Sequence, residues 1–146
     1  MDNEITTKRC RIRPFREEDI PAFADYRNDM AWMRYQGFKG QTEDEYRQAL
    51  LKPPTMEEGM QLAMADKKTD ALLGDLYLGR EGERIYLGYS IHPDWAGKGL
   101  AREAAQGLLD ELARQGVRWV YAGVLPGNAA SLGLLGRLGF EKVEEE

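Results

Sequence analysis

The sequence predicts an α/β fold of the α+β kind, in which helices flank a mostly antiparallel, twisted sheet. Two observations favour it. Some segments alternate apolar and polar residues, and others are rich in β-branched and aromatic residues. Short polar turns at 67–70 and 81–83 join these segments, as in β-hairpins. Other segments repeat apolar residues at helical spacing. The expected strands are 7–13, 59–66, 71–79, 84–91 and 118–124, and the expected helices are 16–27, 42–51 and 100–115, with a short helical turn at 31–35.

The first strand and the first helix are separated by a proline. Alternation over 7–13 places Cys10 and Ile12 on one face of a strand. Pro14 ends that strand, because proline has no N–H group to donate to a ladder. Residues 16–27 carry acidic residues early and apolar residues at a period of 3.6, which predicts an amphipathic helix.

A capping signal marks the second helix. Thr42 is followed three residues later by Glu45, and this capping box predicts that helix 42–51 begins there. Three strands then follow through short turns. Gly88 lies within the last of them, 84–91, and predicts a β-bulge or a close approach of the backbone.

The stretch 89–104 organises the rest of the chain. A strand ends at Pro93, and Gly97 and Gly99 then precede the amphipathic helix 100–115. A glycine turn that opens onto a helix N-terminus leaves backbone N–H groups without intrahelical partners, and the helix dipole adds positive charge there. The sequence therefore predicts an anion site suited to a phosphate or a diphosphate.

Two well-known phosphate motifs do not fit this loop. A P-loop needs Ser or Thr directly after its lysine, and neither follows Lys98. The dinucleotide-binding fingerprint needs a third glycine where Arg102 stands. A plain strand-to-helix turn without a ligand fits the loop about as well when the loop is taken alone.

Length, charge and cysteine content limit the class of protein. We expect the 146 residues to form one domain, 1–146, with a sizeable core. The net charge of −5 argues against bulk binding of nucleic acid and suits cationic substrates. We find no membrane-spanning run and no signal peptide, and therefore expect no membrane partner. The lone cysteine, Cys10, is expected to be a buried thiol, which fits a cytoplasmic protein.

Further motifs follow the glycine loop in a fixed order. Beyond the strand 118–124 come Pro126-Gly-Asn-Ala-Ala-Ser131 and then Leu-Gly-Phe140. With the loop His-Pro-Asp-x-x-Gly-Lys-Gly-x-Ala and the opening Arg11-Ile-Arg-Pro-Phe-Arg-Glu-Glu-Asp19, this set resembles the GNAT superfamily of N-acetyltransferases. The branch it resembles most includes ribosomal-protein N-terminal acetyltransferases. The resemblance implies about four helices and a mixed sheet that splays apart at a cofactor cleft.

The resemblance also implies a site for acetyl-CoA as co-substrate. The diphosphate would lie on the amides of the glycine loop, and the pantetheine arm would pair with the backbone near Ile91, where two strands splay. Asn128 and Ser131 would lie along the pantetheine and near the thioester sulfur. The implied cofactor-binding residues are Ile91, Trp95, Ala96, Gly97, Lys98, Gly99, Leu100, Ala101, Asn128 and Ser131.

Two positions depart from the family pattern. Asp94 stands where the family often has Gln or Arg, and a carboxylate there is unfavourable beside a diphosphate unless it points away or caps the turn. Leu135 stands where many members carry a tyrosine that acts as the general acid. We therefore expect Ser131 to hydrogen-bond or protonate the leaving thiolate.

The expected acceptor is a primary amine on a protein N-terminus or a small molecule. A lysine-like amine costs roughly 4–5 kcal/mol to deprotonate at pH 7, and an N-terminal amine about 1–2 kcal/mol. The candidate general bases are Asp75 and Glu83, with Glu81 and His92 as further choices. For each carboxylate, a solvated surface position is the alternative interpretation, and for His92 it is a local hydrogen bond at the strand end.

Aromatic residues are expected to wall the acceptor pocket. Trp32, Tyr35 and Phe38 are evenly spaced in a loop, and Tyr86 lies on a central strand. Core packing is the alternative for the three loop residues. The residues expected to line the pocket are Trp32, Tyr35 and Tyr86.

Three functions remain open at this point. The first is an N-acetyltransferase, the second an acyl-CoA-binding module without catalysis, and the third an unrelated α/β domain that binds a phosphorylated ligand or nothing. The family closes with two strands, but here Phe140–Val143 can only start one before three glutamates. We therefore expect the final strand to be shortened or missing, and the bare sheet edge to allow a homodimer.

Overall fold

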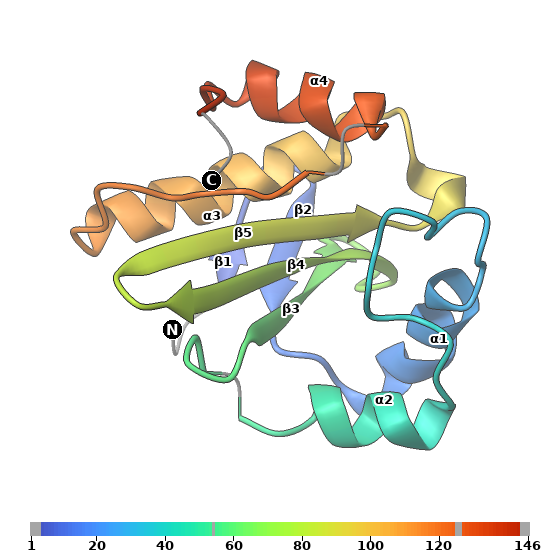
Figure 1. Ribbon diagram of the computed structural model, residues 1–146. Helices are drawn as coiled ribbons and strands as arrows, with labels where there is room; N and C mark the ends of the chain where they lie inside the picture. Colours follow the sequence, from blue (N-terminus) through green and yellow to red (C-terminus); the bar gives the residue numbers. More distant parts are fainter. Residues whose placement is uncertain (1–3, 54, 125–126, 144–146) are drawn as a thin grey trace.

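The structure is a computed structural model that describes residues 4–53, 55–124 and 127–143. Its elements follow one another in the order shown in Figure 1. They are β1 (Ile5–Thr6), β2 (Cys10–Arg13), a 3₁₀ turn η1 (Glu17–Asp19), α1 (Ile20–Arg27), α2 (Glu43–Leu50), β3 (Met60–Asp66), β4 (Leu72–Glu81), β5 (Arg84–Ile91), a 3₁₀ turn η2 (Pro93–Trp95), α3 (Leu100–Arg114) and α4 (Ala129–Arg137).

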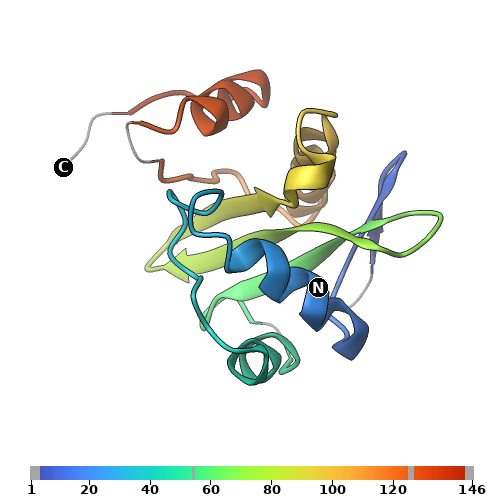
Figure 2. The ribbon, with the colours of Figure 1, turned by 90° about the vertical axis from the view of Figure 1, so that its right-hand side faces the viewer.

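The five strands form one antiparallel sheet in the order β1-β2-β3-β4-β5. Helices α3 and α4 lie on one side of this sheet, and α1 and α2 lie on the other (Figures 1 and 2). Each side has its own apolar core. One core joins the sheet to α3, and the second joins the opposite face to α1 and α2. The α+β fold and the mostly antiparallel sheet expected from the sequence are confirmed.

Of the first two expected helices, one is divided and the other begins where expected. The helix expected over 16–27 is a 3₁₀ turn followed by α1, which begins at Ile20. Pro21 occupies the second helical position, where it has no N–H group to continue a helix from the preceding turn. Helix α2 begins as expected, because the Oγ1 of Thr42 accepts from the Glu45 N–H and the Glu45 carboxylate accepts from the Thr42 N–H.

The strand expected over 118–124 is reduced to a single parallel bridge between Tyr86 and Tyr121. The Leu87 N–H donates to the Tyr121 carbonyl, and the Tyr121 N–H donates to the Ile85 carbonyl, both at 2.8 Å. Within the described residues, the rest of that segment forms no ladder with β5. Beyond Leu87 the outer edge of β5 therefore pairs with no strand among the described residues. This gap beside β5 is the splay that the resemblance implied.

The glycine that permits a close backbone approach is Gly74, not Gly88. The expectation of a bulge at Gly88 is wrong, because Gly88 pairs in regular register with Tyr77. The register shift in the sheet lies between Met64 and Ala65 instead. A Cβ on Gly74 would lie 2.3 Å from the Ser90 carbonyl oxygen, so a side chain there would push β4 and β5 apart.

Gly107, in the middle of α3, has a packing reason. A Cβ there would lie 2.6 Å from the Cγ2 methyl of Thr7. Thr7 cannot turn away, because its Oγ1 donates to Glu103 and accepts from the Cys10 N–H. The absence of a side chain therefore lets the β1–β2 turn lie directly on α3.

We expect Gly107→Ala to lower the free energy of unfolding by about 1 kcal/mol. Alanine gains about 1 kcal/mol in helix propensity, but overpacking costs about 1–3 kcal/mol. In a Thr7→Ser background, which keeps the hydroxyl and removes the methyl, the same change should be stabilising. Urea denaturation of the two single variants and the double variant tests this, and a Gly107→Ala protein more stable than the parent would contradict it.

The C-terminal part of the described chain ends without a strand. Leu135 is buried, and Leu134, Leu138 and Phe140 pack on the core between the sheet and α3. Residues 140–143 form no strand, which agrees with the expectation of a shortened or missing final strand, and 144–146 lie outside the described residues. The homodimer through a bare edge stays a prediction. None of the described helices combines the length and the apolar character needed to cross a bilayer.

Candidate active site

The loop between β5 and α3 is shaped by a histidine cap and two glycines. The Nδ1 of His92 accepts from the Asp94 N–H at 3.0 Å and starts the turn η2, which confirms the local hydrogen bond expected for this histidine. The Asp94 carboxylate is 82% exposed and so stays in solvent. Gly97 and Gly99 have φ angles of +77° and +78°, in the left-handed region that favours glycine.

The amides of this loop have no hydrogen-bond partners among the residues that the structure describes. The first N–H group of α3 with a hydrogen-bond acceptor is that of Glu103, which donates to the carbonyl of the N-cap residue Gly99 at 3.0 Å. Across residues 4–53, 55–124 and 127–143, no acceptor lies within hydrogen-bonding distance of the N–H groups of 97–101. No side chain caps the helix either. With the helix dipole, these amides form a ready site for an anion.

The outer edge of β5 offers further backbone groups beside this loop. Because the Leu87 N–H points outward to Tyr121, alternation directs the N–H and carbonyl groups of Tyr89 and Ile91 the same way. Gln36 Nε2 donates to the Tyr89 carbonyl at 3.4 Å. The two N–H groups face the splay with no acceptor among the residues that the structure describes, so an extended polar chain has donors to pair with there.

The loop between α1 and α2 closes one side of the splay. Trp32 Nε1 donates to the Ile91 carbonyl at 2.8 Å, and the Tyr35 hydroxyl donates to the Gly127 carbonyl at 2.8 Å. These two expected pocket residues therefore do reach the splay. Tyr86 does not join them, because its ring packs on the tyrosine of the neighbouring segment, with centroids 5.7 Å apart. Phe38 packs against the core under α1, as in the alternative interpretation.

A pair of hydroxyl groups spans the splay from β5 to α4. The Tyr89 hydroxyl lies 2.6 Å from Ser131 Oγ. Asn128 Oδ1 caps α4 by accepting from the Ser131 N–H at 3.1 Å, and the Asn128 amide nitrogen has no acceptor among the described residues. Burial raises the pKa of Tyr89, more than the Ser131 hydrogen bond lowers it, so the phenol keeps its proton at neutral pH. Sequence reasoning missed Tyr89, although alternation from Ile91 places both on one face of β5.

Asp75 is not positioned to act as a base. It is fully buried, and its two carboxylate oxygens accept from Arg27 Nη2 at 2.7 Å and from the Tyr26 hydroxyl. Burial acts to lower the pKa of Arg27, but the charges of Asp75 and Tyr26 and their hydrogen bonds together outweigh it, and the pKa is raised. The carboxylate is thus committed to a buried ion pair, which argues against the catalytic role expected for it.

The two candidate glutamates lie at the opposite end of β5 from Tyr89 and Ser131. Glu83 belongs to the exposed turn of the β4–β5 hairpin, six residues before Tyr89, or about 20 Å along a strand. Glu81 ends β4 at the same hairpin and is exposed as well. The structure therefore does not bring either glutamate to the hydroxyl pair. His92 uses its Nδ1 lone pair in the cap described above.

A twisted antiparallel sheet, a gap beside β5 and a glycine loop before α3 are together typical of acyltransferase folds. Comparison with known families assigns the family. Residues 9–141 match the family described as "Acetyltransferase (GNAT) domain". This chain belongs to that family of acetyltransferases. The expectation drawn from the motifs is therefore confirmed at the level of fold and family.

Individual relatives differ in how much of the chain they cover. An N-acetyltransferase of Bacillus subtilis, named as uncharacterized, is 27% identical over 141 residues, which are 94% of this chain and 82% of that protein. The [ribosomal protein uS5]-alanine N-acetyltransferase of Escherichia coli is 47% identical over 58 residues, 39% of this chain and 30% of that enzyme. The spermidine N-acetyltransferase of Vibrio cholerae, solved with CoA and spermine, superposes with a TM-score of 0.77 at 21% identity, covering 94% and 82% of the two chains.

Proposed function

We propose that the 146 residues form one acetyltransferase domain that moves an acetyl group from acetyl-CoA to a primary amine by direct attack. The observation that carries this proposal is the row of unpartnered amides at 97–101, directly beside the free edge of β5. A diphosphate and an extended arm joined to it need these two features side by side. The CoA-bound relative from Vibrio cholerae, which shares the fold, supports the choice of donor.

The proposed contacts follow the expected residues. The diphosphate lies on the amides of 97–101, and the preceding turn residues Trp95 and Ala96 bring the chain to that point. The pantetheine arm pairs with the N–H groups of Tyr89 and Ile91, and with the side-chain amide of Asn128. One of those N–H groups meets the oxyanion as the amine attacks.

Ser131 and Tyr89 together handle the leaving thiolate in this proposal. The serine hydroxyl donates its proton to the sulfur while the tyrosine hydroxyl, 2.6 Å away, replaces it. The proton that the amine loses on forming the amide passes to solvent, and solvent returns one to the tyrosine. The tyrosine that the family pattern places at Leu135 is thereby supplied from β5. CoA thiolate is a good leaving group, so the pair accelerates the reaction without being indispensable.

The acceptor that fits best is an amine with a low pKa. Asp75 is locked in an ion pair, and Glu83 and Glu81 lie at the far hairpin. Without a positioned carboxylate, the acceptor amine must lose its proton to water before it attacks. At pH 7 this deprotonation costs only about 1–2 kcal/mol for a protein N-terminus. The match to the ribosomal-protein alanine N-acetyltransferase of Escherichia coli supports the same choice.

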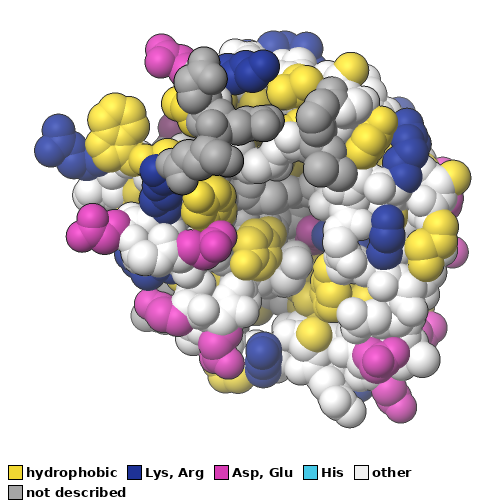
Figure 3. Space-filling view, in the orientation of Figure 1, with side chains coloured by type: hydrophobic (Ala, Val, Ile, Leu, Met, Phe, Trp, Pro, Cys, Tyr) yellow, Lys and Arg dark blue, Asp and Glu magenta, His cyan; other side chains and the backbone are white. Residues whose placement is uncertain are grey.

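The face of the molecule drawn in Figure 3 suits amine-bearing partners better than nucleic acid. On the face in Figure 3, basic and acidic side chains are interspersed, without one large basic patch. The lone thiol, Cys10, is buried, and burial raises its pKa, which makes it unreactive and suits a reducing compartment. We accordingly place the enzyme in the cytoplasm, acting without nucleic acid or membrane as partners.

Thiol release from acetyl-CoA over a panel of amines tests the proposal. The panel contains alanine- and serine-starting peptides, spermidine, and amino acids with a free α-amine. We expect the peptides with free N-termini to be the best acceptors. Calorimetry with CoA runs in parallel, because binding without turnover of any amine would favour the acyl-CoA-binding module instead. Two observations favour that second candidate. Asp75 is held in an ion pair with Arg27, and Leu135 stands where many family members have a catalytic tyrosine.

We expect Ser131→Ala to lower kcat about 100-fold, the lower end of the usual range for loss of a general acid because the CoA thiolate is a good leaving group, while KM for acetyl-CoA changes little. Tyr89→Phe should lower kcat about 10-fold in the parent protein. In a Ser131→Ala background the same substitution should lower kcat by less, because the two hydroxyls act in series. Steady-state kinetics of the two single variants and the double variant check this. Unchanged kcat in Ser131→Ala with the best acceptor would remove the serine from the mechanism.

A further inference from the structure

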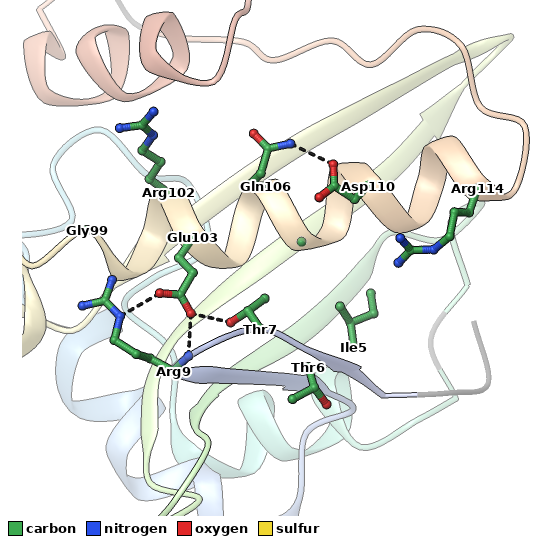
Figure 4. A pocket seen from close by; sticks show the side chains of 11 residues that line it. Ile5, Thr6, Thr7, Arg9, Gly99, Arg102, Glu103, Gln106, Asp110 and Arg114 are labelled. Atoms are coloured by element: carbon green, nitrogen blue, oxygen red, sulfur yellow. Dashed lines mark hydrogen bonds and ion pairs between the residues drawn. The ribbon is translucent and has the colours of Figure 1, made fainter.

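The turn between β1 and β2 is fastened to the first turn of α3. Figure 4 shows the Glu103 carboxylate meeting this turn at the Gly99 end of a groove of about 650 Å³. It accepts from the Thr7 hydroxyl at 2.5 Å, from the Arg9 N–H at 2.7 Å and from Arg9 Nε at 2.7 Å. Burial acts to raise the pKa of Glu103, but these hydrogen bonds outweigh it and the pKa is lowered, so the carboxylate stays charged.

The same guanidinium also holds the glycine loop. Arg9 Nη1 donates to the Lys98 carbonyl at 3.0 Å. A Cβ on Gly99 would lie 3.5 Å from Arg9 Nη2, so the guanidinium lies directly against the loop. One side chain from the N-terminal strands thus joins α3 to the peptide between Lys98 and Gly99.

The geometry of that peptide connects this contact with the anion site. In a trans peptide the C=O and the following N–H point in opposite directions. Because Arg9 holds the Lys98 carbonyl, the Gly99 N–H must point away from Arg9, and it has no acceptor among the described residues. A loop with two glycines has many accessible conformations, and this hydrogen bond selects the one in which the amide is presented.

The charge of Arg9 has a second effect. Glu103 places a carboxylate in the first turn of α3, where it would repel a diphosphate bound at the helix N-terminus. The ion pair with Arg9 at 2.7 Å neutralises that charge. The arginine therefore both orients the loop and removes a repulsion, without occupying the anion site itself.

We propose that Arg9, anchored by Glu103, is a positioning residue that orients the glycine loop for the diphosphate of the acyl donor. This rests on the proposed function. It predicts that Arg9 matters for donors that contain a diphosphate and not for donors that lack one. S-acetylpantetheine, which ends before the diphosphate, provides that comparison.

The test combines Arg9→Met and Arg9→Lys with calorimetry and kinetics. Arg9→Met should raise Kd for CoA and KM for acetyl-CoA about 10-fold, while kcat changes less than twofold. kcat/KM with S-acetylpantetheine should stay at the parent value. Arg9→Lys keeps the positive charge without the forked contacts, so its Kd for CoA and KM for acetyl-CoA should lie between those of the parent and those of Arg9→Met. Arg114→Met, at the opposite end of the same groove, is the matched control and should leave all constants unchanged.

The outcomes separate the two proposals. If the parent protein binds no CoA, the proposed function fails, and the role of Arg9 fails with it. If the parent binds CoA and Arg9→Met binds it equally well, only the positioning role is overturned. An equal loss with acetyl-CoA and S-acetylpantetheine would also overturn it, because that pattern indicates general damage to the fold.

Discussion

Asp75→Asn is expected to lower the free energy of unfolding by about 3–5 kcal/mol, the typical cost of removing one partner of a buried ion pair. Arg27 is 3% exposed, and its positive charge would lose the carboxylate that it contacts at 2.7 Å. The introduced amide keeps a single oxygen, so Arg27 and the Tyr26 hydroxyl, whose pKa is raised well above its usual value by burial and then by Asp75, would compete for one acceptor. Chemical denaturation followed by fluorescence measures the loss.

A matched variant distinguishes the charge effect from the packing of this cluster. Replacing all three polar partners, as Tyr26→Phe, Arg27→Met and Asp75→Leu together, removes the charges and keeps similar volumes. This variant should be far closer to the parent in stability than Asp75→Asn alone. If Asp75→Asn instead unfolds within 1 kcal/mol of the parent but loses turnover of amines, then Asp75 is catalytic and the structural assignment is wrong.

The same residue illustrates where sequence reasoning ends. Asp75 lies in a strand whose neighbours alternate, and nothing local distinguishes a base in a cleft from a partner in a buried pair. Its partner Arg27 is 48 positions away and is brought to it by the packing of α1 on β4. Charge pairs formed by tertiary contact are therefore invisible in a single sequence, whereas the capping box at Thr42 is predictable because both of its members are local.

Local chemistry also explains what was predicted well. The glycine loop was recognisable because positive φ angles and an uncapped helix end both leave marks in the sequence, at Gly97, Gly99 and the helical pattern that follows. Its support from Arg9 was not recognisable, because that contact spans 89 positions. The strand at Tyr121 was overpredicted for a related reason. Strand propensity cannot tell that β5 and its neighbour diverge after one bridge.

Gly97→Ala combined with Gly99→Ala is expected to weaken binding of CoA at least 100-fold. Each position has a left-handed φ, which costs an L-residue with a side chain about 1–2 kcal/mol. The loop escapes that strain by changing conformation, and its amides then no longer converge on one point. A loss of about 2.7 kcal/mol corresponds to 100-fold in Kd. Titration calorimetry with CoA and with pantetheine measures the change, and pantetheine should be unaffected.

Two comparisons identify the main chain as the source of this binding. Gly136→Ala, in α4, adds the same methyl group where a Cβ has open space and φ is not left-handed, and it should leave Kd for CoA unchanged. Lys98→Met removes the cation of the loop and keeps its amide; we expect a loss of no more than about 10-fold, since an exposed charge pair contributes only about 1 kcal/mol. A larger effect from Lys98→Met than from the two alanines would show that the side chain binds the diphosphate, and that the unpartnered amides have another reason to face the splay.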